Sequence, residues 1–168
     1  PVDYEIARRK MVDCQVRPND VTDEAVIHAF STVPREAFLP KAKQALAYSE
    51  LELKTVEGRA IWSARDMAKL FQAMALKSSD LALVIAAGEG YASALMQNIV
   101  DTVIALDSDE AVVEDVGERL LSLGYDRIAY VSGDLKQGYP GEGPYDAILV
   151  NGMVEQVPDA WLKQLKPG

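Results

Sequence analysis

The chain has 168 residues, with 17 Lys or Arg against 26 Asp or Glu, and 49% of its residues are hydrophobic. These values are typical of one globular domain that can bury a substantial core. With one cysteine (Cys14) and one histidine (His28), a disulfide framework and a Cys/His metal site are both excluded. No metal is therefore expected.

The net charge of −9 argues against nucleic acid as the main ligand, because such binding relies on clustered Lys and Arg. The longest apolar runs, such as 81–87, are far shorter than the ~20 residues that span a bilayer. The first residues lack the basic start and apolar run of a secretory signal. A cytoplasmic protein without a membrane partner is expected.

The first fifty residues predict short helices. Apolar residues recur at helical spacing over 4–15 and again over 22–31, where Asp20 and Thr22 are candidate caps. Leu51, Leu53 and Val56 permit a short strand before a Glu-Gly turn. This part of the chain, residues 1–62, is expected to form a helical extension.

Residues 63–74 predict a longer helix. Its apolar side chains are spaced i, i+3, i+4 and i+7, and Ser63 and Asp66 stand like the two halves of a capping box. For Ser63, a helix cap is favoured over a catalytic role.

Strands and helices then alternate. Apolar runs at 81–85, 102–106, 128–131 and 147–150 predict buried strands, and 91–98 and 109–123 predict helices, the second of which ends at Gly124. This alternation predicts an α/β fold with a doubly wound, mainly parallel sheet, with 81–85 as a central strand. Residues 63–168 would form its core within a single domain, and we expect further strands beyond residue 168.

The stretch 81–107 reads as strand, glycine turn, helix, strand and then an acidic residue. Glycines let the backbone approach a ligand, and Asp107 at the end of the second strand can accept both hydroxyls of a ribose. A dinucleotide fingerprint needs a third glycine where this chain has Ser93. S-adenosylmethionine (SAM), which has a ribose but no pyrophosphate, is therefore favoured.

Several segments in the same order resemble protein-L-isoaspartate O-methyltransferases. They are Val-Pro-Arg-Glu-Ala-Phe-Leu-Pro at 33–40, Ala-Tyr-Ser at 47–49, Gly-Glu-Gly-Tyr at 88–91, Gly-Asp at 133–134 and Tyr-Asp-Ala-Ile-Leu-Val at 145–150. The resemblance implies a Rossmann-like SAM-dependent methyltransferase whose N-terminal helices partly cover the cofactor side.

The resemblance also implies the cofactor residues. The glycine loop falls on Ala86, Gly88, Glu89 and Gly90, the ribose site falls on Asp107 and Ser108, and the adenine side falls on Asp134 and Leu135. Two positions depart from the family pattern. Val84 stands where an acidic residue usually faces the methionine amino group, and Ala86 replaces the first loop glycine.

The larger departure concerns the methyl acceptor. An ungapped alignment places Trp62 on the family's serine, whose hydroxyl lies beside the reacting carboxylate. A tryptophan offers one N–H and no hydroxyl. Ser63 could substitute for that serine only if the backbone slips by one residue. Trp62 and Ser63 are thus the candidate catalytic positions.

Two functions follow. The first is a SAM-dependent methyltransferase of the isoaspartyl type, which acts on a protein or peptide carboxylate in protein repair. Because of Trp62, its activity on isoaspartyl peptides is expected to be weak or absent. The alternative is a catalytically impaired relative that acts as a SAM-binding or protein-interaction module, favoured by Trp62, Val84 and Ala86. A dehydrogenase is a distant third. The sequence does not determine the oligomeric state.

Overall fold

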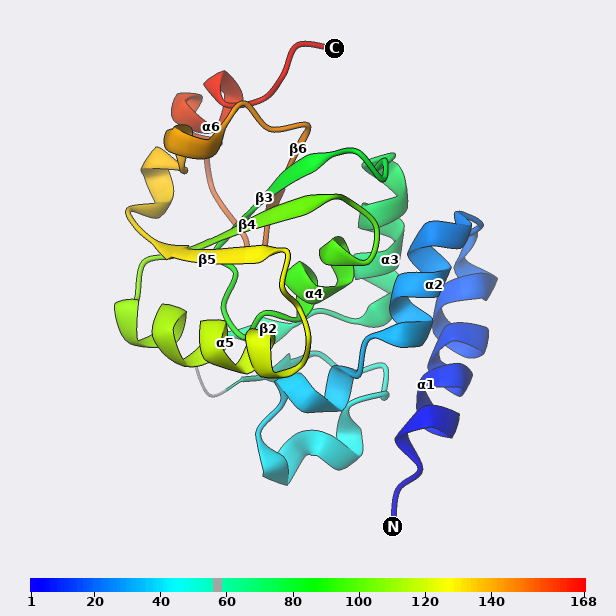
Figure 1. The fold of residues 1–168 in the computed structure, drawn as a ribbon. Helices are drawn as coiled ribbons and strands as arrows, with labels where there is room; N and C mark the ends of the chain where they lie inside the picture. The colour runs from blue at the N-terminus through cyan, green and yellow to red at the C-terminus, as the bar shows by residue number, and fades with distance from the viewer. Residues whose placement is uncertain (56–58) are drawn as a thin grey trace. The chain divides into compact units, whose positions relative to one another are not determined.

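The computed structural model describes residues 1–55 and 59–168. The chain forms two compact units, Pro1–Leu76 and Lys77–Gly168, which are called unit 1 and unit 2 below (Figure 1). The arrangement expected from the sequence, a single domain with a division at residue 62, stays a prediction.

Unit 1 consists mainly of short helices. The helix predicted over 4–15 is found as α1 (Tyr4–Met11), followed by a π-helical turn, η1 (Val12–Val16). The helix predicted over 22–31 is α2 (Glu24–Thr32), but its cap was wrong. Asp23, rather than Asp20 or Thr22, accepts hydrogen bonds from the first-turn N–H groups, because its side chain lies directly before the first helical residue. The 3₁₀ turns of unit 1 are η2 (Arg17–Asn19), η3 (Arg35–Phe38) and η4 (Lys41–Leu46).

The end of unit 1 carries a small hairpin and a capped helix. Strands β1 (Leu53–Lys54) and β2 (Ala60–Ile61) pair antiparallel. Val56 and the Glu-Gly turn predicted after it lie outside the described residues. Helix α3 (Ala64–Ala73) begins where the sequence predicts, and the Ser63 hydroxyl accepts from the Asp66 N–H at 3.2 Å.

Unit 2 contains the parallel sheet that the alternating pattern predicts. Its strands are ordered β5-β4-β3-β6, and every neighbouring pair is parallel. Strand β3, with β4 on one side and β6 on the other, is central, as expected for residues 81–85. The strands are β3 (Leu81–Ile85), β4 (Thr102–Asp107), β5 (Ile128–Ser132) and β6 (Ala147–Val150).

Helices cover both faces of this sheet (Figure 1). On one face lie α4 (Tyr91–Gln97) and α5 (Glu110–Ser122). On the other face, α6 (Asp159–Lys163) places Trp161 in a buried cluster with alternate residues of β3 and β4, such as Leu83 and Ile104. The turns η5 (Leu135–Gln137) and η6 (Pro140–Glu142) fill the loop after β5. The α/β fold class predicted from the sequence is confirmed.

Side-chain caps and one glycine define the limits of α5. Asp109 accepts from the N–H groups of Ala111 and Val112 at its start. At its end Gly124 has a φ of 91°, the left-handed conformation expected of a helix-ending glycine. Among the described residues, no helix is long and apolar enough to cross a membrane.

Candidate functional site

The turn after β3 has an unusual backbone. Ala86, Gly88 and Gly90 have φ values of 60°, 54° and 92°, so that three residues within five are left-handed. Glycine adopts this conformation without steric cost, whereas alanine does not. The backbone therefore supports the sequence interpretation that position 86 suits a glycine, and Ala86 occupies it under strain.

Asp107 anchors this turn. It is the last residue of β4, is fully buried, and accepts from the Gly88 N–H at 2.9 Å through Oδ2. Its Oδ1 accepts from the N–H groups of Ser108 at 2.8 Å and Asp109 at 3.4 Å. The Tyr130 hydroxyl donates to the Gly88 carbonyl at 2.7 Å from the neighbouring strand β5. The carboxylate predicted to bind ribose thus also fixes the glycine turn.

Gly90 has a packing role that the sequence interpretation missed. A Cβ atom at this position would lie 3.1 Å from a methyl of Val116 and 3.2 Å from one of Leu120, both on α5. The second glycine of the turn therefore permits the close packing of this turn against α5. At the third position Ser93 is fully buried within α4.

The predicted adenine-side residues differ in their roles. Asp134 caps η5 by accepting from the Lys136 N–H at 3.0 Å, which is ordinary turn chemistry for an aspartate. Leu135 instead lines a cavity together with Ile85, Ala86 and Val150. Of the predicted cofactor residues, Ala86 and Leu135 line this cavity, and Gly88 and Asp107 are joined in the adjacent turn.

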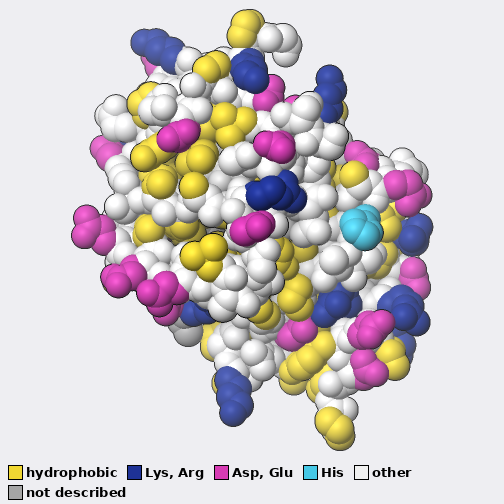
Figure 2. Space-filling model, in the orientation of Figure 1, with side chains coloured by type: hydrophobic (Ala, Val, Ile, Leu, Met, Phe, Trp, Pro, Cys, Tyr) yellow, Lys and Arg dark blue, Asp and Glu magenta, His cyan; other side chains and the backbone are white. Residues whose placement is uncertain are grey.

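The cavity lies at the carboxyl ends of β3 and β6 and has a volume of about 780 Å³. Its walls continue along the segment after β6 to Trp161 of α6. Met153, Val154 and Val157 on that segment are exposed hydrophobic residues. In Figure 2, hydrophobic side chains gather between α6 and β5, and Lys and Arg lie scattered among acidic residues. The carboxyl edge of unit 2 therefore offers a mainly apolar hollow.

Trp62 and Ser63, the candidate catalytic positions, lie in unit 1. Both side chains are partly buried. The Ser63 hydroxyl caps α3, as favoured from the sequence. The carbonyl of Trp62 accepts from Arg35 Nη2 at 2.9 Å. The backbone that carries the two residues is thus held on one side by a buried guanidinium and on the other by the start of a helix.

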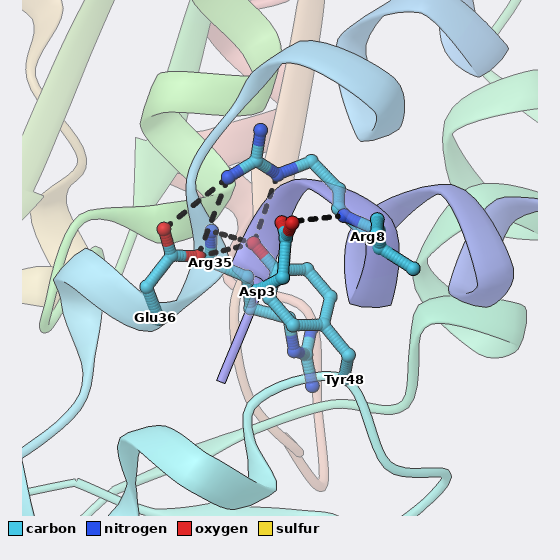
Figure 3. Close-up of polar contacts among 6 residues, drawn as sticks. Asp3, Arg8, Arg35, Glu36 and Tyr48 are labelled. Atoms are coloured by element: carbon cyan, nitrogen blue, oxygen red, sulfur yellow. Dashed lines mark hydrogen bonds and ion pairs between the residues drawn. The ribbon is translucent and has the colours of Figure 1, made fainter. Parts of the chain in front are cut away.

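Arg35 belongs to a polar cluster for which the sequence interpretation assigned no role (Figure 3). Arg35 is fully buried, and its Nε donates to the Ala47 carbonyl at 2.6 Å. The Tyr48 hydroxyl donates to Glu36, and it accepts from Arg8 Nε at 2.9 Å and from the Arg35 N–H at 3.1 Å. Arg8 also pairs with Glu36 at 3.2 Å.

Burial, reinforced by the hydrogen bond to Glu36, raises the pKa of the Tyr48 hydroxyl far above its usual range. Tyr48 therefore remains a donor at neutral pH, and the cluster stays intact. Apart from Arg8 of α1, its residues come from Val-Pro-Arg-Glu-Ala-Phe and Ala-Tyr-Ser, two of the segments that carry the family resemblance. Two charged residues within an otherwise apolar segment were the available signal of buried polar contacts here: Glu36 pairs with Arg8, and Arg35 donates to backbone carbonyls.

Comparisons with solved structures first define the class of protein. A precorrin-6Y C5,15-methyltransferase from Geobacter metallireducens has a TM-score of 0.55 at 19% identity, and the match covers 63% of this chain and 59% of that one. At this identity the likeness shows the fold alone. This chain therefore shares its α/β fold with that solved protein.

Closer comparisons define the family. The family model for protein-L-isoaspartate(D-aspartate) O-methyltransferase matches residues 7–168. Proteins named protein-L-isoaspartate O-methyltransferase from Herpetosiphon aurantiacus and protein-L-isoaspartate O-methyltransferase 2 from Pelobacter propionicus are 36% and 37% identical, over 96% and 98% of this chain and 72% and 73% of their own lengths. The chain belongs to the protein-L-isoaspartate O-methyltransferase family, as its motifs predict.

A solved protein-L-isoaspartate O-methyltransferase has a TM-score of 0.86 at 28% identity. The match covers 95% of this chain, which spans about half (52%) of that solved chain. The methyltransferase type predicted from the sequence is therefore confirmed, and none of these comparisons favours the impaired alternative.

Proposed function

We propose that the protein transfers a methyl group from SAM to the free carboxylate of an isoaspartyl residue in a protein or peptide. The observation that carries the proposal is the glycine turn at the carboxyl end of β3, anchored by Asp107, in a chain of this family. Ligands of open α/β sheets bind at this edge.

The residues at the carboxyl edge fit SAM. The cavity of about 780 Å³ is within the range of roughly 300–1,000 Å³ that is usual for ligand sites. Leu135 and Val150 offer apolar walls to an adenine ring, and the left-handed backbone at Gly88 keeps side chains out of the turn. When bound, SAM would supply an electrophilic methyl group on a sulfonium centre.

Asp107 would hold the ribose from the position in which it anchors the turn. Backbone N–H groups of Gly88, Ser108 and Asp109 already donate to this carboxylate. A ribose hydroxyl would therefore share the carboxylate with the turn. Cofactor affinity and the conformation of the turn would then depend on the same side chain.

Methyl transfer to a carboxylate needs little acid–base catalysis. The acceptor carboxylate is already ionised at neutral pH, so the protein need not remove a proton. Its residues would act by aligning the acceptor oxygen with the methyl group and by excluding water. The family resemblance assigns the acceptor-side role to the segment of Trp62 and Ser63. The Ser63 hydroxyl accepts from Asp66 and can still donate its own proton to a carboxylate.

Calorimetric titration of the protein with SAM and with its demethylated product tests the cofactor part of the proposal. We expect each to bind with one-to-one stoichiometry. Mass spectrometry of an isoaspartyl peptide incubated with protein and SAM tests the transfer, and the expected product carries one methyl ester. SAM binding without any ester would support the module alternative, and the absence of SAM binding would contradict the proposal.

A further inference from the structure

Unit 1 contains a small polar cleft of its own. It has a volume of about 190 Å³, enough for roughly six water molecules at ~30 Å³ each, or for one short polar group. Its lining residues come from η1, from η2, from the segment after η4 and from the start of α3. They are Cys14, Gln15, Asn19, Glu50, Ser63 and Arg65.

Gln15 is the informative residue of this cleft. Its side chain is only 7% exposed, and its Nε2 donates to the Tyr48 carbonyl at 2.8 Å, which fixes the orientation of the amide. Within the described part of the chain, its Oε1 has no hydrogen-bond partner. A buried acceptor without a partner typically costs about 1–3 kcal/mol, so a ligand that brings a donor would remove a penalty.

The local backbone accounts for the position of Gln15. It lies in the π-helical turn η1, a rare element that is frequent at functional sites. The Asn19 side chain donates to the Gln15 carbonyl at 2.8 Å and closes that turn. Gln15 is thus held by its side-chain nitrogen and its main-chain oxygen, and its side-chain oxygen remains for another donor.

The rest of the cleft offers complementary groups. Arg65 is a donor, its side chain is 57% exposed, and its Nε also contacts Asp66 at 3.2 Å. Ser63 supplies a hydroxyl, and Glu50 is an exposed acid. Together the cleft presents an acceptor beside donors in a volume suited to one small planar group. A peptide unit, which has one N–H and one carbonyl, matches this pattern.

We propose that this cleft binds one backbone peptide unit of the methyl-acceptor polypeptide. The peptide N–H donates to Gln15 Oε1, and the peptide carbonyl accepts from Arg65. Because Gln15 Oε1 has almost no accessible surface of its own, binding requires the exposed side chains that line the cleft to shift while the Nε2 bond to the Tyr48 carbonyl is kept. This inference rests on the proposed function for the nature of the ligand, and it assigns acceptor recognition to a position next to Ser63.

The test measures binding of a fluorescent isoaspartyl peptide by anisotropy, with the whole chain and without SAM. Gln15→Met keeps the size of the side chain and removes its acceptor, so we expect about tenfold weaker binding. Gln72→Met is the matched control. Gln72 makes hydrogen bonds to Thr22, Asp23 and Asp20 in the same unit but does not line the cleft, so its loss should lower stability without changing peptide affinity.

A second test varies the peptide and leaves the protein unaltered. In a series of peptides with one backbone nitrogen methylated at a time, one position should weaken binding to the wild type about tenfold. That position should have no effect on binding to Gln15→Met. The inference would be overturned if the wild type bound every N-methyl peptide with the same affinity. It would also be overturned if Gln15→Met kept the wild-type affinity, or if Gln15→Met and Gln72→Met lost affinity equally.

The two proposals fail in different ways. If the wild type binds the peptide with the expected dependence on Gln15 but forms no methyl ester, the proposed function is wrong and the cleft assignment stands. If the wild type forms methyl esters and Gln15→Met retains the wild-type affinity, the cleft assignment is wrong and the proposed function stands.

Discussion

Asp107 accepts backbone N–H groups from Gly88 on one side and from Ser108 and Asp109 on the other. A residue that was expected only to bind ribose therefore also holds the turn on which the cofactor would rest. Its replacement should affect both stability and binding.

We expect Asp107→Ala to weaken SAM binding by about 1.5–3 kcal/mol, the range for hydrogen bonds to a charged group, and also to lower the melting temperature. Calorimetric titration and thermal unfolding measure the two effects. Asp134→Ala is a useful comparison, because Asp134 caps only a short 3₁₀ turn. An unchanged SAM dissociation constant in Asp107→Ala would contradict the ribose assignment.

Ala86 adopts a left-handed backbone conformation that costs an L-residue roughly 1–2 kcal/mol. We therefore expect Ala86→Gly to raise the free energy of unfolding by about 1 kcal/mol, measured by urea denaturation. Ala111→Gly, at an exposed position in α5, should lower it by about 0.5–1 kcal/mol. A destabilised Ala86→Gly would show that the turn is not strained at this residue.

Trp62 is expected to lower methyl transfer, because the family resemblance implies a serine hydroxyl at this position and this chain has a bulky ring instead. Loss of an oriented polar contact in a transition state typically costs on the order of 10²–10³ in rate. Trp62→Ser should raise the rate of ester formation on an isoaspartyl peptide by a factor in this range, with SAM affinity unchanged. An equal or lower rate would indicate that Ser63 or the backbone positions the acceptor in the wild type.

At the scale of elements, the backbone hydrogen bonds between β6 and β3 are supplemented by the side chain of Asp146, the residue before β6. Asp146 accepts from the Leu81 N–H at 2.8 Å and pairs with Lys166 at 3.1 Å. The hydrogen bond from Leu81, with help from Lys166, lowers the pKa of the Asp146 carboxyl below its ordinary value.

A lowered pKa in the folded state means that the stabilisation is present above the unfolded-state value of about 3.9 and is lost as the pH falls through the folded-state pKa. Asp146→Asn should thus lower the free energy of unfolding by about 0.5–1 kcal/mol at pH 7, a small effect because the pair is solvent-exposed. The difference should shrink below about pH 4. Asp126→Asn, at an exposed position, is the control, and a difference independent of pH would contradict the assignment.

The elements that the sequence predicted best are those that depend on local signals. The cap of α3 followed from Ser63 and Asp66, the end of α5 from Gly124, and the central position of β3 from its continuous apolar run. Each is determined by a few neighbouring residues. The cap of α2 was wrong because three polar residues within four positions, Asp20, Thr22 and Asp23, offer similar chemistry, and only the backbone decides among them.

At the scale of the whole molecule, the sequence predicted the family and the parallel sheet but not the long-range contacts. Arg35 reaches the carbonyls of Ala47 and Trp62, which are 12 and 27 residues away. Gly90 packs against α5 rather than only against a ligand. No local pattern specifies such contacts, because they depend on how distant segments fold together. The candidate site residues were therefore easier to name than their individual roles.

The central claim is methyl transfer to an isoaspartyl carboxylate. It is tested most directly by incubating the protein with methyl-labelled SAM and two peptides that differ only in an isoaspartyl or an ordinary aspartyl linkage. We predict base-labile label on the isoaspartyl peptide, at a rate that Trp62→Ser increases, and none on the aspartyl peptide. Equal labelling of the two peptides would contradict the account. So would the absence of label on both peptides when the wild type and Trp62→Ser both bind SAM.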